Sequence, residues 1–244
     1  VSGAKQIQLL GLNGVYSQLM IENIPFMRGL GSAFGLEYIP GTWMNSISIS
    51  KGTSAVINGY ESITGQINAE FKKPEAKEKF FFNYYLNDAG RHEFNVNAAA
   101  DLNKKVSTIL LGHYSFNNSE IDHNKDGFVD MNTGRQVNVA NFWQYISPKG
   151  LEMRWGVRLL DETRSGGQIS GSPYFVASPE GLWKSEISNR RGEAFVKTGY
   201  IFKDKPGTSF GFINSFSVHE MDMLFGSKTY SGLQKSFYSN FIFH

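Results

Sequence analysis

The sequence predicts a mainly β protein: a transmembrane antiparallel β-barrel, represented by about eight strands, preceded by part of a small α+β domain that lies inside it. Two observations lead to this fold. From Lys79 onward, eight runs of about 9–12 residues alternate between apolar and polar side chains, the pattern of strands with two different faces. Short turns and longer polar connections alternate between the runs, as in barrels whose strands cross a membrane.

Composition sets the limits for this prediction. The 244 residues are 41% hydrophobic and 14% aromatic, which is typical of folded chains, and there is no cysteine for disulfides or thiolate metal sites. A net charge of +2, with scattered basic residues, argues against nucleic acid as a partner. No apolar run approaches the ~18–20 residues of a membrane helix, whereas a barrel strand needs only ~10 alternating residues.

The first domain is expected over Val1–Pro74. Short strands are predicted at Gln6–Leu10 and Ser17–Ile21, and a short helical turn around Tyr38–Pro40. The central feature is Ile47–Lys73, where Ile47 and Ile49 alternate with serines and predict a half-buried strand. Gly-rich turns then lead to a second strand, Gln66–Phe71, which ends before Pro74 because proline cannot continue a central ladder.

The second domain, residues 75–244, contains the eight alternating runs. The clearest is Leu151–Leu160, where Leu151, Met153, Trp155, Val157 and Leu159 lie opposite Glu152, Arg154, Gly156 and Arg158. Glu152, Arg154 and Arg158 are therefore predicted to face the lumen, where they either contact the first domain or line a polar cavity. The predicted strands are Lys79–Leu86, His92–Asp101, Val106–Phe116, Val137–Ile146, Leu151–Leu160, Ala194–Phe202, Phe210–Val218 and Phe237–Phe243.

The connections favour a barrel over a soluble sandwich. Short turns are expected at Asn103-Lys104, Pro148–Gly150 and Asp204–Gly207. They alternate with Asn87–Arg91 and with three long polar loops, Asn117–Gln136, Asp161–Arg190 and Glu220–Gln234. A soluble β-sandwich also has period-2 strands, but its wet face would then carry Trp155, Phe212 and Phe241.

The Ile47–Lys73 segment resembles the end of the plug domain of TonB-dependent outer-membrane receptors. The matching positions are Lys51-Gly52, Ser54, Asn58-Gly59 and the Gly-x-Ile-Asn of Gly65 to Asn68. Upstream, Leu19–Pro25 is similar to the Leu-Ile-Asp-Gly-Val-Pro of the family. The chain departs from the family at Asn45, Ser46 and Ser48, where acidic residues that pair with the barrel wall are common, and at Glu22-Asn23, which replaces Asp-Gly.

The resemblance implies a receptor in the outer membrane of a Gram-negative bacterium that binds a scarce nutrient, most commonly a ferric siderophore, and imports it to the periplasm. It implies as partners TonB with its inner-membrane energising complex, an extracellular small-molecule or metal-chelate ligand and the lipid bilayer. A surface lipoprotein is a further candidate partner. No covalent chemistry is required, so an enzyme is not expected. The alternatives are a barrel enzyme of lipase or protease type and a non-transporting surface adhesin.

Size indicates that more strands are needed than the chain supplies. The interior of an eight-stranded barrel is filled by its own side chains. A plug of ~70 residues has a radius of gyration near 11 Å and does not fit there. The chain is therefore expected to be a fragment that carries about eight strands of a larger barrel, which in the family has about twenty-two.

One polar loop carries a candidate cation site. Asp122, Asn124 and Asp126 are spaced i, i+2, i+4 and followed by Gly127, which matches the start of a calcium-binding loop. Phe128 would add its carbonyl and Asp130 a further oxygen, whereas the twelfth position is threonine rather than glutamate. The alternative is a solvated, Asx-rich loop. The aromatic residues expected to contact either substrate or one another in the outer loops are Tyr174, Phe175, Trp183 and Tyr230.

Overall fold

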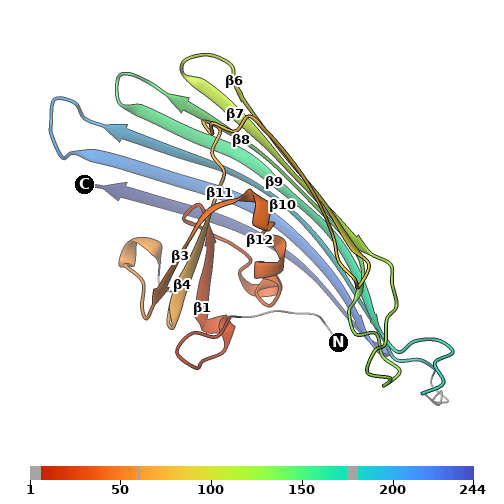
Figure 1. Cartoon of the computed structure of the whole chain (residues 1–244). Coiled ribbons are helices and arrows are strands. Elements are labelled where there is room, and N and C mark those ends of the chain that lie inside the picture. The colour runs from red at the N-terminus through yellow and green to blue at the C-terminus, as the bar shows by residue number, and fades with distance from the viewer. Residues whose placement is uncertain (1–6, 60, 175–180) are drawn as a thin grey trace.

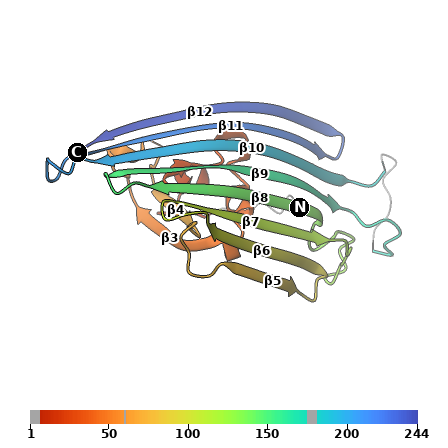
Figure 2. The ribbon, with the colours of Figure 1, turned by 90° about the horizontal axis from the view of Figure 1, so that it is seen from above.

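The protein folds into two β-sheets in the computed structural model, which describes residues 7–59, 61–174 and 181–244. A four-stranded sheet has the order β2-β1-β4-β3, and an eight-stranded sheet has the order β12 to β5 without a crossover. Figure 1 shows the large sheet as a curved wall with the small sheet on its concave side, and Figure 2 shows the wall from above. The wall is open, with β5 and β12 at its two edges.

The small sheet forms largely where the sequence predicts it. Its strands are β1 (Ser17–Ile21), β2 (Ile24–Pro25), β3 (Met44–Lys51) and β4 (Gly65–Phe71). Strand β4 pairs in parallel with β1 and antiparallel with β3. The helical segments among the described residues are short 3-10 turns: η1 (Gly14–Tyr16), η2 (Gly29–Gly31), η3 (Gly35–Tyr38), η4 (Gly41–Trp43) and η5 (Val56–Asn58).

Two details of the small sheet differ from expectation. The described part of the Gln6–Leu10 segment is not a strand; Leu9 makes a single bridge to Leu12 across a turn in which Leu10 has a positive φ of 54°. Strand β3 is present, but its predicted half-burial is wrong, since Ile47 and Ile49 are 51% and 58% exposed. Strand β3 is the edge of its sheet, and none of the described residues covers this face of it.

All eight predicted wall strands are confirmed, and each pairs antiparallel with its sequence neighbour. They are β5 (Phe80–Leu86), β6 (Arg91–Asp101), β7 (Val106–Asn117), β8 (Thr133–Ile146), β9 (Leu151–Gly167), β10 (Lys184–Ile201), β11 (Ser209–Phe225) and β12 (Lys228–Phe243). No helix in the described part of the chain is both long enough and apolar enough to span a membrane.

The predicted loop lengths are partly wrong. The segment Asp161–Arg190 is not one loop, because β9 extends to Gly167 and β10 begins at Lys184. The segment Glu220–Gln234 is not a loop at all: β11 and β12 continue to a two-residue turn at Gly226, whose φ is +60°. The strict alternation of short and long connections therefore fails. The end of β9 carries polar residues on both faces, so the period-2 signal is lost there. In β11, by contrast, Met221, Met223 and Phe225 keep an apolar face inside the segment expected to be a loop.

The outward face of the wall carries an apolar band. The register pairs Leu151 with Tyr200 at one end, and Asp161 with Arg190 at the other, about ten residues further along. The side chains of Asp161 and Arg190 form an ion pair of 3.4 Å there. At about 3.3 Å per residue and with the tilt typical of barrels, the band is roughly 25 Å tall, the height of a bilayer core.

The inward face packs on the small sheet through aromatic side chains. Trp43 meets Phe71 edge-on with ring centroids 5.6 Å apart, and Phe71 stacks on Phe142 of β8 at 6.2 Å. Phe142 in turn contacts Phe195 of β10 at 5.5 Å. This cluster is part of the main hydrophobic core, so the small sheet and the wall share one core.

The outward band generates a prediction for membrane stability. Val157 is 47% exposed within the band, and Val157→Arg should cost about 2–4 kcal/mol in a bilayer because it places a charge among lipid chains. Thr163→Arg, on the same face of β9 beyond the Asp161–Arg190 pair, is the matched control and should cost at most about 1 kcal/mol. Denaturant unfolding in lipid vesicles measures both, and equal costs would contradict a lipid-facing band.

Candidate functional site

The interface between the two sheets is centred on one buried carboxylate, Glu22. Glu22 and Asn23 form the two-residue turn between β1 and β2, with φ of 58° and 60°. This conformation suits a tight hairpin and fixes the direction in which the carboxylate points. Glu22 is only 4% exposed, so its charge is almost fully removed from water.

Cations from both sheets surround this carboxylate. Lys73, which follows β4, donates to Oε1 and Oε2 at 2.7 and 2.8 Å. From the wall, Arg154 donates to Oε2 at 3.3 Å and Lys197 lies 3.5 Å from the same oxygen. Lys197 also donates to the Glu22 carbonyl, and the Phe71 amide donates to Oε1 at 2.9 Å. One side chain of the small sheet thus binds two strands of the wall.

The pKa of Glu22 reflects these contacts. Burial by itself raises the pKa, but the charges of Lys197 and Lys73, with hydrogen bonds from Lys73 and the Phe71 amide, hold it at about 2. Glu22 is therefore ionised at neutral pH while the two sheets are in contact.

A second polar cluster joins η3 to the wall. The Tyr38 hydroxyl donates to Glu162 at 2.5 Å, and Asn189 donates to the same carboxylate at 3.0 Å. Arg164 donates to Glu162 and, at 2.6 Å, to Glu37 of η3, which belongs with the small sheet to the first domain (the small sheet unit). Burial and the neighbouring Glu162 carboxylate raise the pKa of Tyr38, so that its hydroxyl remains a donor.

The wall residues singled out from the sequence lie in different surroundings. Arg154 points to the small sheet and contacts Glu22. Arg158 is 7% exposed, donates to Glu193 and lies 5.6 Å above the ring of Phe26. Glu152, by contrast, has a largely exposed side chain, which lies 3.9 Å from the Arg154 guanidinium and accepts a long 3.5 Å hydrogen bond from Gln144.

The plug-motif residues shape turns of the small sheet. Gly52 and Gly59 have φ of 83° and 89°, which favour glycine, and Gly59 caps η5 just after Asn58. A Cβ at Gly65 would lie 2.4 Å from the Ser50 carbonyl oxygen, so a side chain is excluded there. The Asn68 side chain accepts from the Asn23 amide at 2.9 Å, and Lys51 is an exposed residue that pairs with Gly65.

The Asp122–Asp130 loop is held by hydrogen bonds to its own backbone. Asp122 accepts from the amides of Asp126 and Gly127 at 3.1 and 2.9 Å, and Asp126 accepts from the amide of Phe128 at 2.9 Å. Asp130 accepts from the amide of His123, and Asn124 contacts Asp126. Among the described residues, no group of three His, Asp or Glu side chains is arranged to hold a metal ion. Calcium binding stays a prediction.

The aromatic residues expected in the outer loops have different surroundings, and Tyr230 lies in β12 rather than in a loop. Tyr174 and Tyr230 are about half exposed, and Trp183 lies 6.4 Å from Phe128. Phe175 lies outside the described residues.

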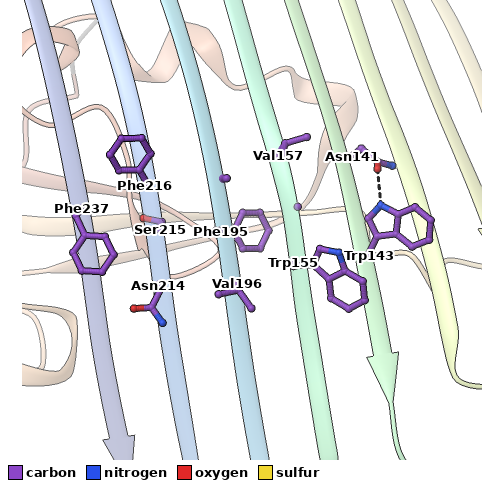
Figure 3. Close-up of a pocket in the computed structure, with 12 residues that line it drawn as sticks. Asn141, Trp143, Trp155, Val157, Phe195, Val196, Asn214, Ser215, Phe216 and Phe237 are labelled. Carbon is purple, nitrogen blue, oxygen red and sulfur yellow. Dashed lines mark hydrogen bonds between the residues drawn. The ribbon is translucent and has the colours of Figure 1, made fainter.

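A hollow of the described structure lies on the opposite face of the wall from the small sheet. It is a groove of about 700 Å³ between the parallel rings of Trp143 and Trp155 and the side chains of Phe216 and Phe237 (Figure 3). It lies within the apolar band, which favours contact with lipid over binding of a polar substrate.

The sequence did not identify several residues of the interface: Glu22 as a contact, Asn189, Glu193 and Lys197. Only Glu22 has a local signal, as a charged residue inside the buried Leu19–Phe26 run. The other three look like ordinary polar positions of an alternating strand.

The comparisons with known proteins give the fold. No protein-family model and no curated protein sequence matches the chain. The open form of the ferric-catecholate import receptor Fiu from E. coli K12 is similar, with a TM-score of 0.67, 11% identity and coverage of 98% of this chain and 40% of Fiu. The copper transporter OprC matches with a TM-score of 0.58, 13% identity and coverage of 91% and 40%. FpvAI, in its complex with pyocin S2, matches with a TM-score of 0.53, 12% identity and coverage of 89% and 37%. The chain thus has the fold of part of these receptors and spans less than half of their length.

Glu22 gives a prediction for the stability of the interface. Glu22→Gln removes the anion but leaves Lys73, Arg154 and Lys197, and should lower the free energy of unfolding by about 3–5 kcal/mol. Because the pKa of Glu22 falls from 4.5 to about 2 on folding, its contribution is present above pH 4.5 and lost as the pH falls toward 2. Denaturant unfolding at several pH values measures this. The exposed Glu152→Gln is the control, and an unchanged pH dependence in Glu22→Gln would contradict the assignment.

The calcium prediction concerns the Asp122–Asp130 loop. Calorimetry on the intact protein should give a calcium heat that Asp126→Ala abolishes, since Asp126 is central to the predicted ligand set. Asp88→Ala, in the turn at 87–90, is the control and should leave the heat unchanged. If the unmodified protein gives no calcium heat, the calcium prediction is wrong and the segment is a solvated, Asx-rich loop.

Proposed function

We propose that this chain is part of a TonB-dependent outer-membrane receptor that imports a scarce nutrient into the periplasm of a Gram-negative bacterium. The observation that carries the proposal is the small sheet docked on the inward face of an open antiparallel wall, in a fold like that of Fiu. An outward apolar band roughly 25 Å tall supports a place in the bilayer. The sequence motif from Lys51 to Asn68 supports the small sheet as the plug.

The proposed mechanism needs an interface that holds and then releases. With the plug docked, the charged and hydrogen-bonded contacts of Glu22, Tyr38 and Glu37 fix it on the wall. A nutrient binds from outside, and TonB, energised by its inner-membrane complex, then pulls on the plug. Water that enters can solvate the separated charges, so ionic contacts are easier to open in water than an apolar interface of equal area.

A ferric siderophore is the proposed substrate. Fiu is described as a ferric-catecholate import receptor, which supports this class, whereas OprC, described as a copper transporter, shows that this fold also occurs in a copper transporter. Growth rescue of a deletion strain by candidate iron chelates and by copper distinguishes the two.

A reversible tether tests the proposed plug movement. A Cβ at Gly232 of β12 would lie 3.6 Å from Cγ of Leu30 in η2, close enough for a disulfide after a small shift. The 244 residues contain no cysteine, so Leu30→Cys with Gly232→Cys adds the one cysteine pair within them. We expect cells with the oxidised pair to bind a radiolabelled ferric catecholate but not to import it, and a reductant to restore import.

Each single-cysteine variant should import the chelate under both conditions, and an uncoupler should stop import in all of them. Import that persists through the tether and the uncoupler would contradict an energised plug. Hydrolysis of lipid or peptide by the purified protein would favour a barrel enzyme, and surface binding to a host or matrix without import would favour an adhesin.

A further inference from the structure

A pair of buried arginines on the wall has more positive charge than its partners neutralise. Arg158 of β9 and Arg191 of β10 are 7% and 9% exposed. Both donate to one carboxylate, that of Glu193, with Arg191 at 3.0 Å. The three side chains therefore carry a net charge of +1 in a place that water scarcely reaches.

The aromatic neighbours relieve this charge only in part. Arg158 and Arg191 lie 5.6 and 5.4 Å from the ring centroid of Phe26, and Arg158 is also 5.6 Å from that of Phe195. A ring face attracts a guanidinium but replaces no hydrogen-bond acceptor. Lys197 of β10, whose ammonium lies 5.9 Å from the same Phe195 ring centroid, adds positive charge and is already engaged with Glu22.

Several donors of the two arginines have no acceptor. Within the described part of the chain, Nε and Nη1 of Arg158 and Nε of Arg191 are buried and donate to no protein group. Native proteins rarely leave such groups unsatisfied, since an unpaired buried donor loses its hydrogen bonds to water without replacement, and the loss is larger for a charged group.

These side chains line a small, partly enclosed cavity between the wall and the small sheet. Its volume is about 30 Å³, and Phe26, Tyr38 and Trp43 of the small sheet unit line it together with Arg158, Arg191 and Glu193. The volume admits one or two atoms of the size of a water molecule but no polyatomic anion such as phosphate.

We propose that this cavity binds a single halide ion, chloride under physiological conditions, between Arg158 and Arg191. The ion neutralises the excess charge and accepts hydrogen bonds from the unpaired guanidinium donors. Because Phe26, Tyr38 and Trp43 form one side of the cavity, the site exists only while the small sheet is docked, and chloride stabilises that docked state. This site is independent of the nutrient that the protein carries.

Bromide substitution tests the site directly. Crystals of the full-length protein grown with bromide in place of chloride should show an anomalous peak in contact with Arg158 and Arg191. A density feature that carries no anomalous signal at saturating bromide would identify a water molecule and overturn the proposal.

Solution stability gives a second readout. At constant ionic strength, replacing gluconate, which is too large for the cavity, with chloride should raise the Tm of the full-length protein in detergent by about 2 °C or more. Arg191→Gln removes the excess charge and should abolish this rise. Arg164→Gln, a buried wall arginine that does not line the cavity, is the matched control and should keep the rise.

An equal chloride effect in Arg191→Gln and the unmodified protein would overturn the proposal, as would no chloride effect in the unmodified protein. Should Arg191→Gln fail to fold, the bromide experiment on the unmodified protein decides.

Discussion

The docking of the small sheet depends on a buried carboxylate that neither sheet can satisfy alone. Glu22 has one cation within its own unit, Lys73, and takes two more from the wall, Arg154 and Lys197. Without the small sheet, Arg154 and Lys197 would lack this anion, and without the wall Glu22 would return to solvent. The positive φ of Glu22 and Asn23 places the carboxylate at the tip of the hairpin, where it reaches the wall. Separation of charges in a buried place is costly, so the interface favours one docking position.

The wall shows how one strand pattern serves two environments. Along β9, outward residues such as Val157 and Leu159 are exposed and apolar, while inward residues such as Arg158 and Glu162 are buried and polar. This inverts the usual relation between burial and polarity in a soluble protein. It is consistent with a wall that meets lipid outside and a polar, hydrogen-bonding partner inside.

The same pattern explains which strands the sequence predicts and which strand ends it does not. Alternation predicted all eight wall strands because the two faces differ in polarity within the apolar band. Beyond Asp161 both faces of β9 are polar, so the sequence predicts a loop there. The extension of β11 keeps an apolar face of Met221, Met223 and Phe225, and the expectation of a loop over this strand signal hides the tight turn at Gly226. Ile47 and Ile49 read as half-buried because an apolar alternation predicts a covered face, but β3 is an edge strand.

The side-chain pairs of the interface cannot be predicted from a single sequence, for a different reason. Arg154 and Arg158 could be assigned to the inward face from period 2 alone, but their partners come from residues more than thirty positions away, Glu22 and Glu193. No local pattern encodes such pairs.

The mixture of aromatic and ionic contacts at the interface also affects how the small sheet can leave the wall. The aromatic core around Phe71 and Phe142 is held by short-range dispersion contact, and a gap of about 0.5–1 Å already removes a quarter to a half of it without any compensation from water. The ionic contacts, by contrast, exchange protein partners for water one at a time, so each step recovers part of its cost through solvation. A proposed chloride at Arg158 and Arg191 follows the same logic, because it is held only by the closed arrangement and is free to leave once water enters. A plug that a periplasmic partner must pull loose needs contacts that are specific while water is excluded from the interface and weak once water enters it.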